Sequence, residues 1–589
     1  MPGLFGGTVG PDELRTMADE TYAGDVHETA RFALDGRALG LTHHGDVDPG
    51  GHTVVDEADV LGLVYGALTR VPTDDPADLV RGVLESPQEV LPRIDGPFLL
   101  VVADRTSDRL LVATDKRGTR ACYYAEPDAS GLVFGSELTA LVPFLDDPSL
   151  DVRAVADMLS MLCVWGERTL LETVRALRPA SYLWYDGGEV SVESYWTPTF
   201  DERTDDGYVP DLADPYTEAI EATLDTVEGA PGLWLSGGLD SRTMAAGMCK
   251  ARDDLVTYTY RRPMGYDSAH FATDRTLAER VATALSVPNE PLEITPESLH
   301  ERLDELVRLT DGMVAWRPLA NVSAVFELDP SAVDAVFEAS DPLIGAHVTQ
   351  DALSGVSHPA DALHEMHARH PDGLVKALLT PEVEPKDTFF EEAVRCRRET
   401  RAETILHATN TNYYFKNHYL GNKVARARVG TRMPLTTERV LRVMNQVPRS
   451  GRRRRVPFTA ALGTPVLSVP APMKLQLLRA LDTDLSKIKY EATQLPPTAP
   501  HALHTAAFLC KETIDRVGTQ PTGTRWLQSD ETLRRYVDDL LLGAADRDLF
   551  DASTIHRLRH EQFHEGTDRT PIISAITTVE LFVRMVLDD

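Results

Sequence analysis

Residues 1 to about 195 carry the hydrophobic pattern of β-strands separated by turns. Apolar and polar positions alternate, or form short apolar runs, in residues 93–103 and again in residues 109–114. A period of two is typical of strands, and a short apolar run bounded by turn residues indicates a buried strand. The pattern therefore predicts a β-rich first domain.

The pattern changes near residue 200. The chain from Tyr195 to Pro215 is polar and loses its periodicity, which indicates a linker. Helical patterns dominate from about residue 216, with intervening strands predicted near Leu233–Leu235, Leu255–Tyr260 and Val333–Phe337. This order predicts an α/β domain with a helical C-terminal part. The expected division is residues 1–198, a linker over 199–215, and residues 216–589.

One segment combines a strand, a glycine turn and a helix start. It contains Leu235, Ser236, Gly237, Gly238, Asp240 and Ser241 in the order Leu-Ser-Gly-Gly-Leu-Asp-Ser. The glycines let the main chain approach a ligand, and the N–H groups that open a helix attract negative charge. The serines add hydroxyl donors, and Asp240 offers a carboxylate to a Mg²⁺ ion bound with pyrophosphate. The segment predicts a site for the phosphates of a nucleotide; no Lys follows the glycines, so it is not a Walker loop.

Charge narrows the classes of partner. The 589 residues include 59 basic and 91 acidic residues, a net charge of −32, and only 10 of the basic residues are Lys. Nucleic acid is therefore not an expected partner. Acid excess with scarce Lys resembles proteins of salt-loving cells, in which molar salt shortens the Debye length to about 3 Å and screens self-repulsion. We expect the fold to weaken at low salt.

The chain offers no pattern for membrane insertion. Its longest apolar run, Phe98 to Ala103, is far shorter than the roughly 20 residues that a membrane helix needs, and the N-terminal residues lack a signal-peptide pattern. We therefore expect a cytoplasmic protein that binds no membrane.

Several motifs together resemble the asparagine synthetase and β-lactam synthetase family. They are the Ser-Gly-Gly-x-Asp-Ser loop, Glu137 in its Gly-Ser-Glu context, and the runs 115–124, 177–180, 431–435 and 474–479. The resemblance implies an N-terminal class II glutamine amidotransferase domain of the Ntn type, followed by a synthetase domain that binds ATP and Mg²⁺. It also implies a small-molecule carboxylate as substrate, and a homodimer is among the assemblies we expect.

The first domain departs from this family at three places. Pro2 stands where members that hydrolyse glutamine have a cysteine nucleophile. The glutamine-holding Asn-Gly-Glu aligns with Tyr65, Gly66 and Ala67, and the expected arginine near His43 is absent. We therefore expect a degenerate domain without glutaminase activity, and free ammonia or an amine as the source of nitrogen.

The synthetase half retains more of the family pattern. By resemblance, Glu338 would act as a base or orient the nucleophile, Asp341 would share the metal with Asp240, and Tyr260 would line the adenine side of the pocket. Thr493 stands where the family has a lysine, so Lys489 is the expected substitute, with Lys487 as an alternative. Each of these residues also has a purely structural interpretation. Glu338 and Asp341 would lie in an acidic loop, Lys489 at a solvated helix end, and Tyr260 in a core strand.

The preferred hypothesis is an ATP-dependent amide-forming ligase that activates a carboxylate, for example aspartate, as an acyl-adenylate. The alternative is a catalytically silent descendant that binds nucleotide and acts as a scaffold or regulator, which the altered positions Pro2, Ala67, Pro342 and Thr493 favour. Another adenylating enzyme, such as an NAD-forming ligase, would share the phosphate loop but not the first domain.

Overall fold

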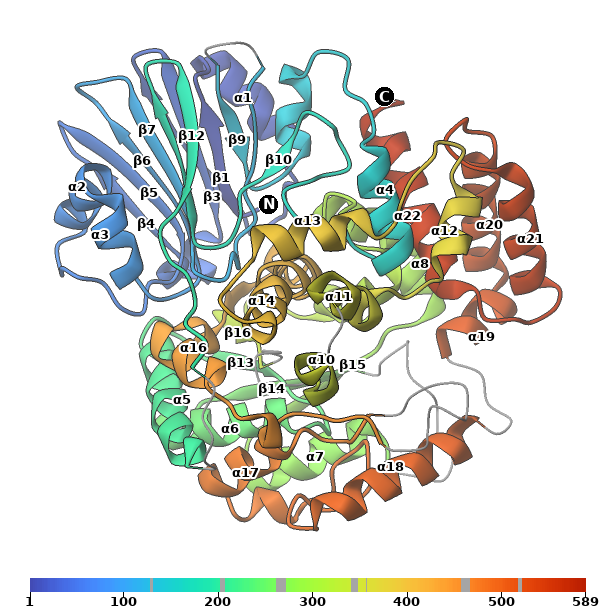
Figure 1. Ribbon diagram of the computed structural model, residues 1–589. Coiled ribbons are helices and arrows are strands. Elements are labelled where there is room, and N and C mark those ends of the chain that lie inside the picture. Colours follow the sequence, from blue (N-terminus) through green and yellow to red (C-terminus); the bar gives the residue numbers. More distant parts are fainter. Residues whose placement is uncertain are drawn as a thin grey trace.

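The first domain contains two antiparallel six-stranded sheets packed face to face (Figure 1). This computed structural model describes residues 1–127, 131–201, 207–260, 272–339, 348–355, 358–456, 467–516 and 522–588. One sheet has the order β10-β8-β9-β1-β3-β2 and the other the order β12-β11-β7-β6-β5-β4. In chain order the strands are Gly3–Gly7, Glu28–Leu34, Arg37–His43, His52–Asp56, Val60–Gly66, Phe98–Asp104, Arg109–Thr114, Tyr123–Ala125, Val133–Gly135, Arg175–Ala176, Ser181–Asp186 and Glu189–Ser194, β1 to β12.

Strand β6 explains the apolar run of the sequence. Leu99 and Val101 point into the core between the two sheets, whereas Leu100 and Val102 pack beneath helix α2 (Pro76–Glu85). Successive side chains of a strand point to opposite faces, so a strand covered on both faces is apolar throughout. Helix α1 (Pro11–Glu20) packs on the outer side of the other sheet. The layers are therefore helix, sheet, sheet and helix, as expected for the Ntn type.

The second domain is built on a five-stranded parallel sheet of order β15-β14-β13-β16-β17. The predicted strands near 233, 255 and 333 are present, with slightly different bounds. In chain order the strands are Pro231–Trp234, Val256–Tyr260, Asn289–Leu292, Ala335–Phe337 and Gly430–Arg432, β13 to β17. Helices flank them: α5 Tyr208–Leu224, α6 Asp240–Ala251, α7 Asp274–Leu285, α8 Pro296–Leu309, α16 Glu438–Asn445 and α17 Pro472–Leu481.

Helices fill the rest of the second half (Figure 1). Helices α19 to α22 gather at one side of the molecule, where α20 and α22 contact α8 and α22 contacts α4. The expected fold class is confirmed. The remaining helices are α3 Pro87–Val90, α4 Val152–Met161, α9 Trp316–Leu319, α10 Gln350–Ser354, α11 Pro359–His367, α12 Asp372–Leu378, α13 Asp387–Arg395, α14 Arg401–Ala408, the π-helix η6 Thr409–Tyr419, α15 Leu420–Asn422, α18 His501–Arg516, α19 Thr522–Ser529, α20 Glu531–Ala545, α21 Ala552–Phe563 and α22 Thr570–Val586.

Part of the segment predicted to be a linker is helical. Helix α5 begins at Tyr208, inside the segment 199–215 that we expected to be an aperiodic linker; Tyr208, Leu212 and Tyr216 are buried, so tertiary packing orders a segment whose sequence looks irregular. Among the described residues, no helix combines the length and apolarity required to cross a bilayer.

Charged groups tie the two domains together. Arg432 of β17 forms a buried bidentate ion pair with Asp48 of the first domain, with N···O distances of 2.6 and 3.0 Å. Nζ of Lys423 donates to the carbonyl of Ser136 (2.7 Å) and to Asp311 (2.5 Å). Because a buried charge without its partner costs several kcal/mol, these pairs fix the relative position of the domains.

Candidate active site

The Ser-Gly-Gly loop lies between β13 and α6, at the carboxyl edge of the parallel sheet. Its hydroxyl groups are engaged within the loop. Oγ of Ser241 accepts from the N–H of Ser236 (3.0 Å) and shares a hydrogen bond with Oγ of Ser236 (2.9 Å), which in turn accepts from the N–H of Gly238 (3.2 Å). These bonds curl the main chain into a cradle in front of the start of α6, where an anion is favoured.

Gly237 is required by its surroundings. A Cβ atom at this position would lie 2.9 Å from Cβ of Leu277 and 3.1 Å from the carbonyl oxygen of Asp274, both on α7. The N–H of Gly237 also donates to Oδ1 of Asp274 (2.9 Å). The loop is therefore packed directly against α7, and a larger residue would push it away from its position.

Arg242 holds the loop from behind. Its buried guanidinium donates to the carbonyl oxygens of Gly237 and Gly238 (3.0 Å each) and to those of Leu485, Ile488 and Lys489. Burial lowers the pKa of Arg242 to about 10, so it stays protonated at neutral pH. The sequence pattern does not point to Arg242, because three of its carbonyl partners lie 243 to 247 residues away in the chain.

A cavity of about 270 Å³ opens beside the loop. Most of the predicted site residues line this cavity. They come from the ends of β13, β14 and β16 and from the start of α6. These lining residues are Leu235, Ser236, Gly238, Asp240, Ser241, Tyr260 and Glu338. Convergence of hydroxyl groups, carboxylates and a helix N-terminus on one cavity makes this the candidate active site.

Glu338 follows β16, the neighbour of β13 in the sheet, and lines this cavity. Its N–H donates to the carbonyl of Arg432 (2.9 Å), which continues the parallel pairing of β16 with β17. Burial raises the pKa of Glu338 from 4.5 to about 7, while a hydrogen bond from Trp234 and the charges of Arg426 and Arg120 act in the opposite direction. A carboxyl group that titrates near neutral pH can accept and release a proton.

Among the lining residues that the structure describes, the cation is Lys474. It lies in the first turn of α17, where a positive charge is unfavourable to the helix dipole, and its Nζ contacts Oδ2 of Asp240 at 2.5 Å. The attraction of Asp240 offsets that cost and holds the ammonium group over the start of α6. The sequence analysis noted Lys474 as a family match but gave it no role.

The predicted lysine does not reach the cavity. The side chain of Lys489 is exposed, and the backbone carbonyl of this residue is the part that contacts the site, as an acceptor for Arg242. Lys487 is also exposed, beside Asp484. Thr493 is buried against His504 of α18, with 2.7 Å between Oγ1 and Nδ1. In the structure Lys474, and not Lys489, lines the cavity, and the catalytic role predicted for Lys489 stays a prediction.

Oxygen donors suit a magnesium ion in this cavity. Asp240, Asp274 and Glu491 contribute carboxylates to its lining, and Mg²⁺ prefers few protein carboxylates together with phosphate oxygens and water. Across the described ranges, no group of three or more His, Cys, Asp or Glu residues could hold a metal by itself. A magnesium ion shared with a nucleotide fits this donor set. The predicted second ligand, Asp341, lies outside the described residues.

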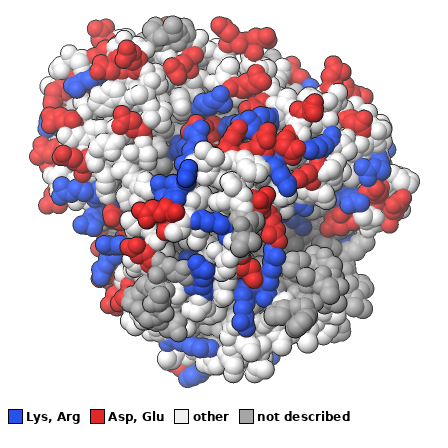
Figure 2. All heavy atoms as spheres, in the orientation of Figure 1, with Lys and Arg blue, Asp and Glu red and all other residues white. Residues whose placement is uncertain are grey.

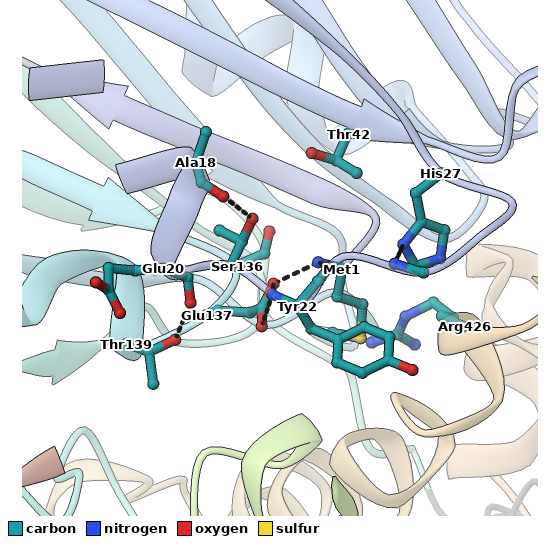
Figure 3. A network of polar contacts seen from close by, with 12 residues as sticks. Met1, Ala18, Glu20, Tyr22, His27, Thr42, Ser136, Glu137, Thr139 and Arg426 are labelled. Carbon is teal, nitrogen blue, oxygen red and sulfur yellow. Dashed lines mark hydrogen bonds and ion pairs between the residues drawn. The ribbon is translucent and has the colours of Figure 1, made fainter. Parts of the chain in front are cut away.

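In the first domain, the amino group of Met1 belongs to a buried polar network with Tyr22 and Glu137 (Figure 3). The amino group of Met1 forms an ion pair with Oε1 of Glu137 at 2.6 Å, both groups being 1% exposed, and it also donates to the carbonyl of Tyr22. Oε2 of Glu137 accepts from the N–H of Tyr22 (3.0 Å). Burial lowers the pKa of the Met1 amino group. Pro2 is buried directly before β1 and contributes no nucleophilic side chain.

Tyr65, which aligns with the glutamine-holding motif of the family, packs against Arg120. Tyr65 is buried in the core between the sheets, and the guanidinium of Arg120 lies over its ring, 5.4 Å from the centroid. Nη2 of Arg120 donates to the carbonyl of Thr431 in the second domain (3.1 Å). Aromatic and guanidinium groups thus pack in this part of the domain junction.

Comparison with family models gives two matches. Residues 72–196 match the model described as a glutamine amidotransferase domain, and residues 217–457 match the model described as asparagine synthase. Both matched ranges lie within the divisions 1–198 and 216–589, whose bounds stay a prediction.

Curated relatives are distant. Amidase chry2 of Gibberella zeae is 24% identical over 227 residues, which are 36% of this chain and 33% of the relative. A Mycobacterium bovis protein named "Putative asparagine synthetase (glutamine-hydrolyzing)" is 24% identical over 290 residues, 47% of this chain and 42% of the relative. The matched part thus spans between a third and about two fifths of the relatives' length.

A solved structure was also matched. It is the glutamine phosphoribosylpyrophosphate amidotransferase from B. subtilis complexed with ADP and GMP, at 10% identity and a TM-score of 0.25, over 51% of this chain and 92% of that one.

Proposed function

Since this chain belongs to the asparagine synthase family, with an amidotransferase-type domain ahead of its synthase domain, we propose that it is an ATP-dependent amide-forming ligase. A substrate carboxylate would attack the α-phosphorus of ATP, releasing pyrophosphate and forming an acyl-adenylate. A nitrogen nucleophile would then attack the acyl carbon, lose a proton and displace AMP. The observation that carries the proposal is the convergence of the Ser-Gly-Gly loop, Lys474 and Glu338 on one cavity.

The loop side of the cavity suits pyrophosphate. Ser236, Gly238 and Ser241 line this side at the start of α6, whose first-turn N–H groups have no partner within the helix, and Lys474 adds a positive charge where negative charge develops on the leaving group. Donors fixed in advance around such a charge are worth about 3–4 kcal/mol each in a site that excludes water. Asp240 and Asp274 would hold Mg²⁺, which when bound supplies charge neutralisation for the phosphates.

Glu338 suits the second half of the reaction. It lines the same cavity as the loop, and burial raises the pKa of its carboxyl group to about 7, so its ionised form can take the proton that the nitrogen nucleophile must lose. Trp234 donates to this carboxylate and fixes its orientation.

Free ammonia or an amine is the proposed nitrogen source. Two observations support this: the network of Met1, Glu137 and Tyr22 contains no thiol, and Tyr65, which aligns with the glutamine-holding motif of the family, packs against Arg120. The first domain would then serve the fold and the junction with the synthase domain. Aspartate is the proposed first substrate to test.

The direct test is pyrophosphate release by the purified protein in high salt with ATP, Mg²⁺, aspartate and ammonium. We expect pyrophosphate and an amide product, and their loss in Asp240→Ala. Asp253→Ala is the matched control, because Asp253 is an exposed carboxylate at the far end of α6. Undiminished release in Asp240→Ala would overturn the assignment of the metal-binding carboxylate.

A silent nucleotide-binding descendant is the second candidate, favoured by the close contact of Lys474 with Asp240, which engages the carboxylate proposed for the metal. Thermal unfolding separates the two. ATP with Mg²⁺ at a hundredfold excess over Kd stabilises a binding protein by about 2.7 kcal/mol. Stabilisation without pyrophosphate release, for any carboxylate tried with ammonium or amines, would favour the silent descendant.

A further inference from the structure

A second cavity, of about 360 Å³, lies at the junction of the two domains, away from the Ser-Gly-Gly loop. One wall comes from the first domain: the turn after β7, which carries Lys116 and Arg117, and the end of β12 with the residues that follow it. The other wall comes from the end of α13, α14 and the start of η6. We call it the junction pocket. Its size suits a nucleotide-sized ligand.

The junction pocket is basic in an acidic protein. Its lining contains five Lys or Arg residues and two Glu residues, whereas the whole chain has 59 basic and 91 acidic residues. On the face drawn in Figure 2, Asp and Glu dominate the upper and outer regions, and much of the Lys and Arg lies in the central strip between the first domain and the helices. Such a local excess of positive charge attracts anions.

Most of these cations already have a carboxylate partner. Nζ of Lys116 lies 2.8 Å from Oδ1 of Asp95, Arg178 forms a bidentate pair with Glu392, and Arg395 pairs with Glu167. The other lining carboxylate, Glu193, accepts from Tyr182 (2.7 Å) and Gln88. These groups position the walls and leave their charges balanced.

Arg398 differs from Lys116, Arg178 and Arg395. Within the described part of the chain no carboxylate forms an ion pair with it, and its buried Nε has no hydrogen-bond partner. Its Nη2 lies 3.3 Å from Nε2 of His407, and Nη1 reaches the carbonyl of Arg397 at 3.4 Å. A half-buried guanidinium with such weak neutral partners is costly, and an anion in the pocket would supply the missing charge.

His407 holds Arg398 in position. Nδ1 of His407 lies 3.1 Å from the carbonyl of Cys396, so this nitrogen carries the proton, and Nε2 is left to accept from Arg398. Burial and the charge of Arg398 lower the pKa of His407 to about 4. The imidazole is therefore neutral at physiological pH and adds no repulsion to a bound anion.

Neutral groups complete the lining. Asn410 and Thr411 add an amide and a hydroxyl from η6, and Trp196, half-buried after β12, offers a flat apolar ring. We propose that the junction pocket binds a small organic anion, with its phosphate or carboxylate group on Arg398 and a planar ring against Trp196. The bound molecule would contact both domains at once, separately from the nucleotide in the candidate active site.

The test uses two planar anions, GMP for a phosphate source and nicotinate for a carboxylate source, with binding measured by calorimetry on the full chain. We expect one of them to bind, and Arg398→Gln to weaken it at least about tenfold, the effect of losing one charged hydrogen bond. Arg398→Lys should retain part of the affinity. Arg397→Gln is the matched control, because Arg397 is the exposed neighbour. Ser241→Ala should leave this binding unchanged even where it abolishes pyrophosphate release.

A second measurement needs no variant. Hydrogen exchange in the presence of the bound probe should slow in residues 192–198 and 396–411, which come from opposite walls of the pocket. The proposal is overturned where neither probe binds the wild-type chain at millimolar concentration, where Arg398→Gln binds as tightly as wild type, or where protection appears only around the Ser-Gly-Gly loop.

Discussion

Nη2 of Arg242 donates a hydrogen bond of 2.9 Å to the backbone carbonyl of Lys489. The same guanidinium donates to the carbonyls of Gly237 and Gly238, so one buried side chain connects the phosphate loop to a segment far away in the chain. The loop therefore depends on the C-terminal half of the domain for its shape. Arg242 contributes through position and not through contact with a nucleotide.

Replacing Arg242 with Met should destabilise the protein by about 3–5 kcal/mol, because it leaves buried carbonyl groups without donors. Denaturant unfolding in high salt measures the loss. Arg280→Met, at an exposed position on α7, is the control and should change stability by at most about 0.5 kcal/mol. Equal stability of the two variants would contradict the role of Arg242.

Lys474 and Lys489 make a decisive pair of variants. Lys474→Met should slow pyrophosphate release by about a hundredfold or more, since it removes a fixed positive charge from the cavity. Lys489→Met should leave the rate nearly unchanged, because that side chain is exposed. Steady-state rates at saturating ATP decide between them; a slow Lys489→Met enzyme with a normal Lys474→Met enzyme would restore the assignment made from sequence.

Amide formation should depend on the ionisation of Glu338. Below its pKa of about 7 the carboxyl group is protonated and cannot accept a proton, so the rate should rise about tenfold per pH unit and level off above pH 7. The rate is measured at constant free ammonia, because ammonia itself titrates. Glu338→Gln should be slow at every pH. A dependence of its rate on pH that matches that of the wild type would exclude Glu338 as the base.

Glu338 should also affect stability with the opposite sense from an ordinary carboxylate. Its pKa is raised from 4.5 to about 7 in the folded protein, so between these values the folded state binds more protons than the unfolded state. The contribution of Glu338 to stability is therefore present in acid and is lost as pH rises to 7. Relative to wild type, Glu338→Gln should be more stable at pH 8 than at pH 5, as judged by Tm.

Glutamine should fail to replace ammonium. With ATP, Mg²⁺ and a carboxylate substrate, ammonium is expected to support amide formation, and glutamine should release no glutamate. Both products are measured in the same assay by chromatography. Glutamine turnover at a rate comparable to that with ammonium would show that the first domain hydrolyses glutamine even though Pro2 replaces the cysteine nucleophile.

High salt should stabilise the fold. With a net charge of −32, repulsion between acidic groups opposes folding in dilute buffer and is screened in molar KCl. We expect Tm to rise steadily between these conditions. A Tm that does not change would mean that local ion pairs already balance the surface charge.

The sequence predicts this site unevenly, for physical reasons. Ser236, Gly238, Asp240 and Ser241 are contiguous, and a strand, a glycine turn and a helix start fix their geometry locally. Lys474 could not be assigned, because its place depends on how α17 packs beside α6. The apolar pattern of β6 predicts a strand, but only the layered fold explains why both its faces are buried.

The buried ion pair between Asp48 and Arg432 affects whether either domain can be expressed without the other. Separating the two domains would expose Arg432 of β17 and Asp48 of the first domain, although both side chains are buried in the intact protein. A synthase half expressed alone would therefore gain an unmatched, partly apolar face. Its loss of solubility would then reflect a missing structural partner, and would say nothing about whether the first domain takes part in chemistry.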